Sequence, residues 1–250
     1  MPRKKKNVVE ETKQNEEVRG GARIVNMYER IPSHFINKVD NPNFHLHNLK
    51  LPFRASIIAP SGSGKTNLLL NLIELFCVGE GTFQTITIIT RNKDEELYRW
   101  LESMSDQIII KEGLNNIPKL DKFDKELNHL VVFDDLVLEK DLSSVCQYYI
   151  RARKLNVSVM FLSQTFFGTP KIIRNNCNYM GLLKLSGNRE VNMILSEFGL
   201  GVTKEQLFSI YEFATREKLQ PLLIDLEAEP EKRFRKGISE IIDPNDIPNI

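Results

Sequence analysis

The sequence predicts an α/β fold in which helices flank a mainly parallel central sheet. Short, near-continuous apolar runs alternate along the chain with segments whose apolar residues recur at helical spacing. Strands of a parallel sheet are apolar on both sides because helices cover both faces of the sheet. A Gly/Ser-rich turn, SGSGKT at residues 61–66, joins the first of these strands to the first helix. These observations together favour one α/β domain.

The strand predictions rest on apolar and β-branched runs, and the helix predictions on apolar residues spaced three and four apart. The expected strands cover residues 53–59, 84–90, 107–110, 130–134, 157–163, 179–185 and 219–226. The expected helices cover residues 65–78, 94–104, 142–153, 189–198 and 204–213.

Length and composition indicate a single domain between two charged ends. The chain has 250 residues, of which 41% are hydrophobic, enough to bury one sizeable core. We predict a flexible charged arm over residues 1–20, because its few apolar side chains cannot offset the entropy of ordering it. The domain is predicted to cover residues 21–228, beginning with an irregular, proline-containing lead-in at 21–52. A charged tail is expected over residues 229–250.

The charge balance excludes a protein that is basic over its whole surface. Lys and Arg together number 34, and Asp and Glu together number 33. Contacts with nucleic acid would therefore have to come from local patches. The PRKKK run at residues 2–6 is a DNA-contacting patch, a nuclear-import signal or a solvated tail.

Cysteine usage and hydropathy constrain the compartment. The three cysteines are far apart and form no CxxC pair, so we expect neither a disulfide framework nor a zinc site, and a reducing compartment fits best. No apolar run approaches the roughly 20 residues that span a bilayer. The basic start of the chain has no apolar segment behind it. We therefore expect neither a membrane span nor secretion.

The strand–turn–helix at residues 53–78 carries the pattern of a phosphate-binding loop, GxxxxGK[ST]. Gly62 and Gly64 let the backbone bend around phosphates without a Cβ in the way, and backbone N–H groups attract the anion. Lys65 would neutralise β- and γ-phosphate oxygens, and the Thr66 hydroxyl would bind Mg²⁺. The residues predicted to bind the nucleotide, expected to be ATP, are Pro60, Ser61, Gly62, Ser63, Gly64, Lys65, Thr66 and Asn67.

The first position of the pattern is occupied by Ala59 instead of glycine. The residue before a proline is pushed toward extended backbone, where alanine is tolerated, so Ala59 before Pro60 is compatible with the loop. A chance match on a Gly/Ser-rich turn is the alternative. Such a match would not usually carry both the preceding apolar strand and the following helix.

A buried strand ending in two acids, LVVFDD at residues 130–135, predicts the magnesium side of the site. Asp134 is expected to hold Mg²⁺ through its water shell, and Asp135 to polarise the attacking water. Many translocating ATPases place glutamate at the second position, and the shorter Asp135 departs from them. The alternative is that both acids belong to a turn that caps the next helix.

The strand at residues 157–163 ends in the polar pair Ser163 and Gln164. Gln164 is predicted to contact the γ-phosphate and orient water; the alternative is a simple exit into a loop. Before this strand, Arg151, Arg153 and Lys154 close a helix, where they either complement its C-terminus or supply an arginine finger to the ATP of a neighbouring subunit.

Arg174, in KIIRNN at residues 171–176, is a second candidate finger, and the sequence alone does not choose between it and the earlier arginines. The four histidines show no metal-ligand spacing and are interpreted as structural or surface residues: His34, His45, His47 and His129. The aromatic residues Trp100, Tyr148 and Tyr149 are predicted to lie in the core; the alternative is that they stack on nucleic-acid bases.

Four stretches occur in the order and at about the spacing of a known family: LPFRASIIAPSGSGKTNLLLNLI, LVVFDDL, RARKLNVSVMFLSQTFF and PKIIRNNCNYMGLLK. The chain resembles the poxvirus-type genome-packaging ATPases of large eukaryotic DNA viruses and virophages, a part of the FtsK–HerA branch of P-loop motors. The segment YEFATREKLQPLLIDL also looks like the family's closing strand. The resemblance covers residues 45–228.

This resemblance implies a P-loop NTPase fold of the RecA/FtsK–HerA type. It implies an ATPase that drives double-stranded viral DNA into a preformed capsid, as a homo-oligomeric ring that grips the DNA backbone and contacts capsid vertex proteins. The family's finger arginine matches Arg153, although Lys154 stands where the family usually has histidine. The expected catalytic set is Lys65, Asp135, Gln164 and Arg153, with Mg²⁺ on Thr66 and Asp134. The implied location is the infected host cell, in a cytoplasmic virus factory or the nucleus, and the virion.

Three other functions share parts of these features. A HerA-like DNA helicase or translocase would use the same fold and chemistry on another DNA substrate. A P-loop small-molecule kinase would need an arginine-rich lid, and no compact lid follows Gln164. A non-enzymatic nucleotide-binding component of a virion is disfavoured by the intact pairs Lys65–Thr66 and Asp134–Asp135.

Overall fold

The computed structural model describes residues 24–35 and 39–247. The chain divides into two compact units, Met1–Asn37 and Lys38–Ile250, and each is described by itself. The predicted arm at residues 1–20 lies outside the described residues. The described part of the first unit contains two 3₁₀ turns, Met27–Arg30 and Ser33–Phe35. The first turn buries none of its side chains, and the Asn26 side chain caps it by accepting the Tyr28 N–H at 3.1 Å.

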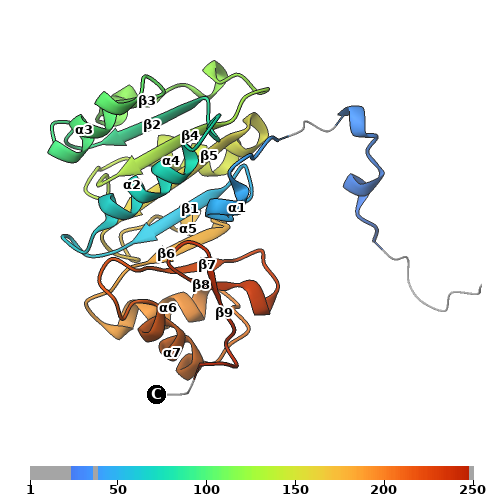
Figure 1. Ribbon diagram of the computed structural model, residues 1–250, viewed down its shortest axis with the longest axis vertical. Coiled ribbons are helices and arrows are strands. Elements are labelled where there is room, and N and C mark those ends of the chain that lie inside the picture. Colours follow the sequence, from blue (N-terminus) through green and yellow to red (C-terminus); the bar gives the residue numbers. More distant parts are fainter. Residues whose placement is uncertain (1–23, 36–38, 248–250) are drawn as a thin grey trace, which may run out of the picture. The chain divides into compact units, whose positions relative to one another are not determined.

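The second unit is built on a nine-stranded sheet in the order β3-β2-β4-β5-β1-β6-β7-β8-β9 (Figure 1). The strands from β3 to β6 in this order pair in parallel, and β7, β8 and β9 extend the sheet in antiparallel fashion. Their bounds are β1 Arg54–Ile58, β2 Thr85–Thr90, β3 Ile108–Glu112, β4 His129–Asp134, β5 Val157–Ser163, β6 Tyr179–Leu182, β7 Leu222–Asp225, β8 Phe234–Lys236 and β9 Glu240–Ile242. The predicted mainly parallel sheet is confirmed.

Helices cover both faces of this sheet because alternate side chains of its strands enter different cores. Ile86 and Ile88 pack in one core with Tyr98 of α3 and the buried side of α2. Ile89, the residue directly after Ile88, points to the other face and packs in another core with Tyr149 of α4. A third core joins α6 and α7 to β6–β9. The helices are α1 Phe44–His47, α2 Lys65–Phe76, α3 Glu96–Met104, α4 Ser143–Arg151, α5 Lys171–Asn176, α6 Asn188–Glu197 and α7 Lys204–Ala214.

The strand register brings three predicted site segments to one edge of the sheet. Ile58 at the end of β1 pairs with Ser163 at the end of β5, and Asp134 at the end of β4 pairs with Leu162. Parallel strands all end on the same edge, so the segments that follow β1, β4 and β5 meet there. The site therefore follows from the strand order and not from proximity in the sequence.

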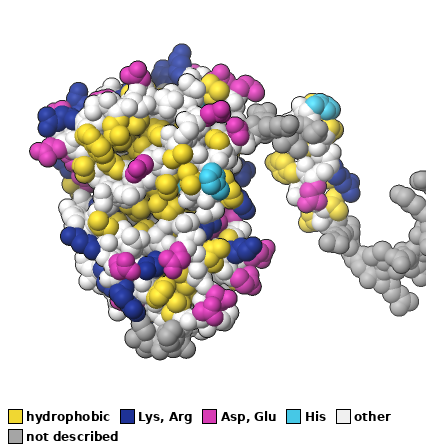
Figure 2. All heavy atoms as spheres, in the orientation of Figure 1, with side chains coloured by type: hydrophobic (Ala, Val, Ile, Leu, Met, Phe, Trp, Pro, Cys, Tyr) yellow, Lys and Arg dark blue, Asp and Glu magenta, His cyan; other side chains and the backbone are white. Residues whose placement is uncertain are grey.

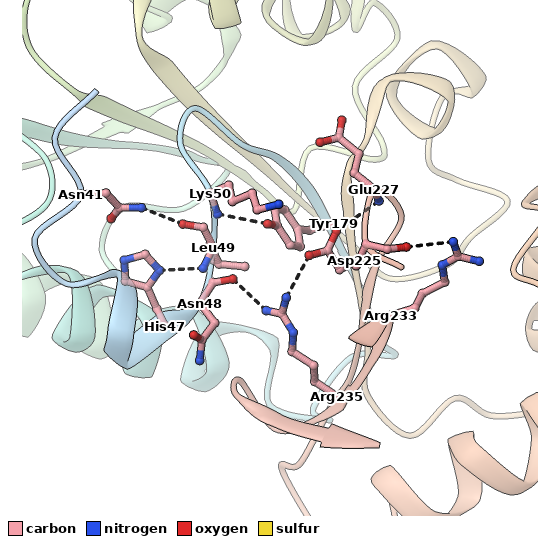
Figure 3. A network of polar contacts seen from close by, with 11 residues as sticks. Asn41, His47, Asn48, Leu49, Lys50, Tyr179, Asp225, Glu227, Arg233 and Arg235 are labelled. Carbon is pink, nitrogen blue, oxygen red and sulfur yellow. Dashed lines mark hydrogen bonds and ion pairs between the residues drawn. The ribbon is translucent and has the colours of Figure 1, made fainter. Parts of the chain in front are cut away.

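The expected charged tail from residue 229 is instead part of the fold, because β8 and β9 belong to the sheet. Phe234 and Ile242 are buried in the core with α6 and α7. Between them Arg235 forms a buried ion pair with Asp225 at 2.9 Å and donates to the carbonyl of Asn48 at 2.9 Å (Figure 3). The high charge of this segment predicted a solvated tail. In the structure, the opposite charges of Arg235 and Asp225 instead neutralise each other inside the protein.

Residues 39–52, the part of the predicted lead-in that belongs to the second unit, contain the short helix α1 and are held by hydrogen bonds between side chains and backbone (Figure 3). Burial lowers the pKa of His47 to about 4, so its ring is neutral at pH 7 and accepts the Leu49 N–H at 3.0 Å. Asn41 donates to the carbonyl of Leu49 at 2.9 Å, and the Tyr179 hydroxyl accepts the Lys50 N–H at 3.1 Å. These contacts hold the chain at the start of β1.

Two aromatic predictions have different outcomes. Tyr148 and Tyr149 of α4 are buried, as expected. The prediction that Trp100 lies in the core is wrong, because its side chain is exposed on α3. Tyr98 and Leu101 form the buried side of that helix instead. Among the described residues, no helix is both long and apolar enough to cross a membrane.

Candidate nucleotide-binding site

The loop between β1 and α2 has the backbone geometry that a phosphate cradle requires. Gly62 has a φ of 74° and Gly64 a φ of 99°, in the left-handed region that favours glycine. A Cβ on Gly64 would also lie 2.3 Å from the Leu219 side chain, whereas a Cβ on Gly62 would meet nothing within 4 Å. Gly64 is the N-cap of α2, so the unpaired N–H groups of the first helical turn begin directly after the loop.

Pro60 and Ser63 shape the loop from within. The carbonyl of Pro60 accepts the backbone N–H of Ser63 at 3.2 Å and its hydroxyl at 2.5 Å. Ala59 is buried, and its N–H donates to the carbonyl of Ser163 at 3.0 Å, which extends the parallel ladder past β1. An alanine is therefore accommodated where the pattern has glycine.

Lys65 folds back over the start of the loop. Its ammonium donates to the carbonyl of Ala59 at 2.9 Å and lies 3.5 Å from that of Pro60. Burial lowers the pKa of Lys65, while the carboxylates of Asp134 and Asp135 raise it. The hydrogen-bond partners of the Lys65 ammonium are neutral carbonyls. An anionic phosphate oxygen would form a stronger hydrogen bond with this ammonium, because the oxygen carries a full charge.

Asp134 is buried at the end of β4, with 5% of its surface exposed. Burial raises its pKa to about 6, against the opposing effects of a hydrogen bond from Tyr98 and the positive charge of Lys65. The Tyr98 hydroxyl donates to Oδ2 of Asp134. Tyr98 itself is fully buried, and burial together with the charge of Asp134 raises its pKa. A hydrogen bond between Tyr98 and the Thr66 side chain lowers the pKa of Tyr98.

Tyr98 is a site residue that sequence reasoning missed. It lies on α3, an element that carries no recognised motif, and it connects Thr66 to Asp134. The sequence signal was a tyrosine on the buried side of an amphipathic helix, which is equally typical of a core residue. Its hydroxyl needs a partner when buried, and the nearby carboxylate supplies one.

Asp135 and Gln164 meet across the strand ends, as Gln164 donates from Nε2 to Oδ1 of Asp135 at 2.7 Å. Asp135 has a φ of 54°, so the backbone turns away from the direction of β4 directly after Asp134. The half-buried carboxylate of Asp135 thereby faces the end of β5 instead of continuing the strand.

A cavity of about 270 Å³ brings most of the predicted site residues together. It is lined by Ser61, Gly62, Gly64, Lys65, Thr66, Asn67, Asp134, Asp135 and Gln164, to which α3 and the residue before it add Leu97 and Glu95. A carboxylate and a hydroxyl, from Asp134 and Thr66, are oxygen donors of the kind Mg²⁺ prefers alongside phosphate oxygens. The donor set therefore fits the expected metal.

The candidate finger arginines do not line this cavity. Arg153 is exposed in the 3₁₀ turn Ala152–Leu155 at the start of β5. The seven residues of β5 separate it from the cavity, a span of about 23 Å at the rise of a strand. Arg174 forms an ion pair with Glu197 at 3.2 Å, and its guanidinium lies 4.4 Å from the centre of the Phe166 ring. Arg174 is thus engaged inside its own chain.

Comparison with known proteins identifies relatives by sequence. The family model described as Poxvirus A32 protein matches residues 42–225. The DNA packaging protein OPG160 of Monkeypox virus is 29% identical over 196 residues, which are 72% of this chain and 63% of that protein. The Vaccinia virus (strain Copenhagen) protein of the same name is also 29% identical, over 72% of this chain and 70% of its own length. The chain thus spans less than two thirds of the Monkeypox virus relative.

Solved structures with the same fold include viral and bacterial ATPases. B204, the DNA-packaging ATPase from Sulfolobus Turreted Icosahedral Virus, superposes with a TM-score of 0.52 at 11% identity, over 71% of this chain and 94% of its own. ATPases 2 and 3 of EssC from Geobacillus thermodenitrificans superpose with a TM-score of 0.51 at 13% identity, over 78% of this chain and 40% of that one. At these identities the likeness concerns the fold, whereas the match over residues 42–225 is to the sequence family. By that match, the chain belongs to the Poxvirus A32 protein family.

Proposed function

We propose that this protein is an ATP-driven motor that moves double-stranded viral DNA into a preformed capsid. The observation that carries the proposal is the single cavity in which the phosphate loop, Asp134, Asp135 and Gln164 converge. Membership of a family whose relatives are named DNA packaging proteins supports the assignment of DNA as the polymer that is moved.

In the proposed mechanism the loop binds the triphosphate through backbone N–H groups at the start of α2, and Lys65 moves from its carbonyl partners to the phosphate oxygens. Thr66 and Asp134 would hold Mg²⁺, and Tyr98 would orient the carboxylate of Asp134. When bound, the metal neutralises charge on the β- and γ-phosphate oxygens.

Hydrolysis would start from a water held beside Asp135 and Gln164. The oxygen of this water bonds to the γ-phosphorus while the bond from that phosphorus to the β–γ bridging oxygen breaks, which leaves ADP and phosphate. Asp135 orients the water and accepts its proton. Gln164 hydrogen-bonds Asp135 at 2.7 Å. Loss of the γ-phosphate beside Asp135 would therefore change the contacts of Gln164 and of the segment that follows β5.

The charge of the cavity supports a cation from a second subunit. Among the residues that line it, Lys65 is the one basic side chain, while Glu95, Asp134 and Asp135 are acidic. A triphosphate adds further negative charge. We therefore propose a homo-oligomeric ring in which Arg153 enters the neighbouring cavity, a contribution worth 10³–10⁵ in rate in related reactions. The ring would bind DNA by contacting the phosphates of the DNA backbone.

The proposed partners are duplex DNA and capsid vertex proteins, and the proposed location is the infected cell, in a cytoplasmic virus factory or the nucleus, and the virion. An ATPase assay with and without duplex DNA, on protein whose mass is measured in the same buffer, tests the motor. We expect DNA to stimulate phosphate release by the wild-type oligomer and the Lys65→Ala variant to release none.

ATP hydrolysis by a strict monomer, at a rate that does not depend on DNA, would contradict the proposal that the protein is a DNA motor. Consumption of ATP only with nucleoside monophosphates would indicate a kinase, and separation of a forked duplex would indicate a helicase. A wild-type ring that binds ATP without releasing phosphate would indicate a structural nucleotide-binding protein.

A further inference from the structure

The segment between α7 and β7 lies against the phosphate loop. β7 is antiparallel to β6, and Leu222 at the start of β7 pairs with Leu182 at the end of β6. Residues 218–221, which lead into β7, therefore lie at the edge of the sheet where the parallel strands end. The side chain of Leu219 contacts the loop, because its Cδ2 lies 2.3 Å from the place that a Cβ on Gly64 would take.

Leu219 has an unusual backbone conformation. Its φ is 70°, in the left-handed region that bulky side chains rarely adopt. Burial of the side chain does not account for this conformation, because Leu219 is 38% exposed. Strained residues of this kind concentrate at ligand-binding sites, where the strain places a contact. The conformation of Leu219 therefore indicates a functional contact beside the loop.

A groove extends from the nucleotide cavity along α2. Asn67, Asn71 and Leu75 line it at intervals of four residues, so they lie along one side of the helix. Residues 218–221 form the opposite wall, and Ser239 in the turn between β8 and β9 also lines the groove. Its volume is about 430 Å³, a usual size for a small-molecule site. We name this feature the α2 groove.

The α2 groove is continuous with the nucleotide cavity. Asn67 lines both of them, and Asn71 donates to the carbonyl of Asn67 at 2.7 Å. Hydrophobic side chains gather at the surface on the face of the sheet that carries α2 (Figure 2). A ligand that fills the cavity can therefore continue into the groove without leaving the surface of the protein.

The proposed catalytic side chains determine the direction of a bound triphosphate. Asp135 and Gln164 follow β4 and β5, and the γ-phosphate is proposed to lie beside them. In the sheet, β5 is on one side of β1, while β6 and then β7 are on the other. With its γ-phosphate toward β5, the triphosphate directs its nucleoside away from β5, toward the segment that leads into β7. That segment is the wall of the α2 groove.

The lining of the α2 groove suits a nucleoside. Apolar side chains alternate with the amides of Asn67, Asn71 and Gln220, and amides both donate and accept hydrogen bonds, as the edge of a base does. Among the described residues that line the groove, Lys218 is the one charged side chain. No carboxylate of this lining therefore repels the adjacent phosphates.

A second hollow that Leu219 also lines is less suitable. None of its described lining residues lines the nucleotide cavity as well. It contains the carboxylates of Glu212 and Glu217, which form ion pairs with Lys184 and Lys236. These paired charges belong to the surface of the fold, and a nucleoside would have to disrupt them.

We propose that the α2 groove binds the nucleoside of the triphosphate, with the base between α2 and residues 218–221. Leu219, which contacts the phosphate loop and lines the groove, is the apolar contact nearest to the phosphates. The inference rests on the proposed function in that it assigns the base end of the same nucleotide. The affinity for ATP then comes from two separable parts, the loop for the phosphates and the groove for the nucleoside.

A photoreactive base locates the nucleoside directly. The full chain is irradiated with 8-azido-ATP and Mg²⁺, with and without an excess of ATP, and the labelled residues are mapped by mass spectrometry. We expect the label that ATP prevents to lie at residues 71–75, 218–221 or 237–239. Label of this kind that is confined to other segments overturns the proposal, and so does the absence of any label that ATP prevents.

A blocking substitution separates the nucleoside from the phosphates. Ser239 is exposed and lines the groove but not the cavity. In calorimetric titrations, we expect Ser239→Trp to weaken binding of ATP with Mg²⁺ by at least about tenfold. Binding of inorganic tripolyphosphate with Mg²⁺, which has no nucleoside, should change by less than about twofold. Ser144→Trp is the matched control, because Ser144 is also exposed but lies on α4 and lines neither feature.

The two titrations distinguish failure of this inference from failure of the proposed function. Unchanged ATP binding by the Ser239→Trp variant overturns the nucleoside site and leaves the proposed motor intact. Equal weakening of ATP and tripolyphosphate binding also overturns the nucleoside site, because the substitution then acts on the phosphate loop. A wild type that binds neither ATP nor tripolyphosphate overturns the proposed function, and this inference with it.

Discussion

The Asp134→Asn substitution neutralises a carboxylate that the fold buries beside the phosphate loop. Burial raises the pKa of Asp134 from 3.8 to about 6, so the folded protein holds the proton more tightly than the unfolded chain. The stabilising effect of that proton is full below the unfolded pKa and is lost as pH rises through the folded value. Asparagine imitates the protonated acid at every pH and still accepts the hydrogen bond that Tyr98 donates.

The size of the effect follows from the pKa difference. About two pKa units at 1.36 kcal/mol each correspond to about 3 kcal/mol of stability that the wild type lacks above pH 7. The pKa of about 6 already includes the attraction between Asp134 and Lys65, so this attraction is not subtracted again. We therefore expect the nucleotide-free Asp134→Asn protein to be about 3 kcal/mol more stable than the wild type at pH 8. Between pH 5 and pH 8 its advantage should grow by about 1.4 kcal/mol.

Urea denaturation of both proteins from pH 5 to pH 8, in EDTA and without nucleotide, measures this difference. Asp106→Asn is the control, because Asp106 is an exposed carboxylate that does not line the cavity. Adding ATP and Mg²⁺ should stabilise the wild type more than the Asp134→Asn variant, since the proposed metal ligand is absent from the latter. A variant less stable than the wild type at pH 8, or an advantage that does not grow with pH, would refute the burial argument.

Three further predictions concern Tyr98, Gly64 and Arg235. Tyr98→Phe should weaken Mg²⁺-dependent binding of a fluorescent ATP analogue by about 1 kcal/mol without changing binding of the analogue in the absence of metal. Tyr149→Phe is the control, because the hydroxyl that it removes is bonded to a carbonyl outside the cavity. The control should change neither the Mg²⁺-dependent nor the metal-free binding. Gly64→Ala should abolish ATP binding in equilibrium dialysis, because the φ of Gly64 is 99°, a backbone conformation that residues with a Cβ rarely adopt. The control Gly187→Ala, with nothing within 4 Å, should bind normally. Arg235→Met should lower the free energy of unfolding by about 3–5 kcal/mol, since it leaves a buried carboxylate unpaired; a loss below 1 kcal/mol in urea would contradict this.

The strands and the phosphate loop could be predicted because the forces that form them act between near neighbours. The loop from Ser61 to Thr66 is framed by an apolar strand and by a helix that starts at Lys65. Each residue's task in such a turn follows from backbone conformation and charge, which a short stretch of sequence determines. The fold class followed from the same local alternation and is confirmed by the sheet.

The sequence predicted that Asp135 and Gln164 lie near each other, but not that they form a hydrogen bond. Two polar residues at the ends of parallel strands meet at one sheet edge, which the sequence implies once the strands are recognised. Their hydrogen bond requires β4 and β5 to be neighbours and the backbone to turn at Asp135. Strand order is a property of the whole chain, so spacing alone does not contain it.

The sequence by itself determined that a glycine-rich loop with the pattern of a phosphate cradle lies between β1 and α2. It also predicted which carboxylates and which amide accompany that loop. Only the tertiary structure decided that Tyr98 joins Thr66 to Asp134, and that Arg174 is engaged within its own chain. It also decided that Trp100 faces outward. Helical spacing shows that a helix has distinct sides, but which side is covered depends on the elements that pack against it. Packing between distant segments is therefore what the sequence pattern leaves open.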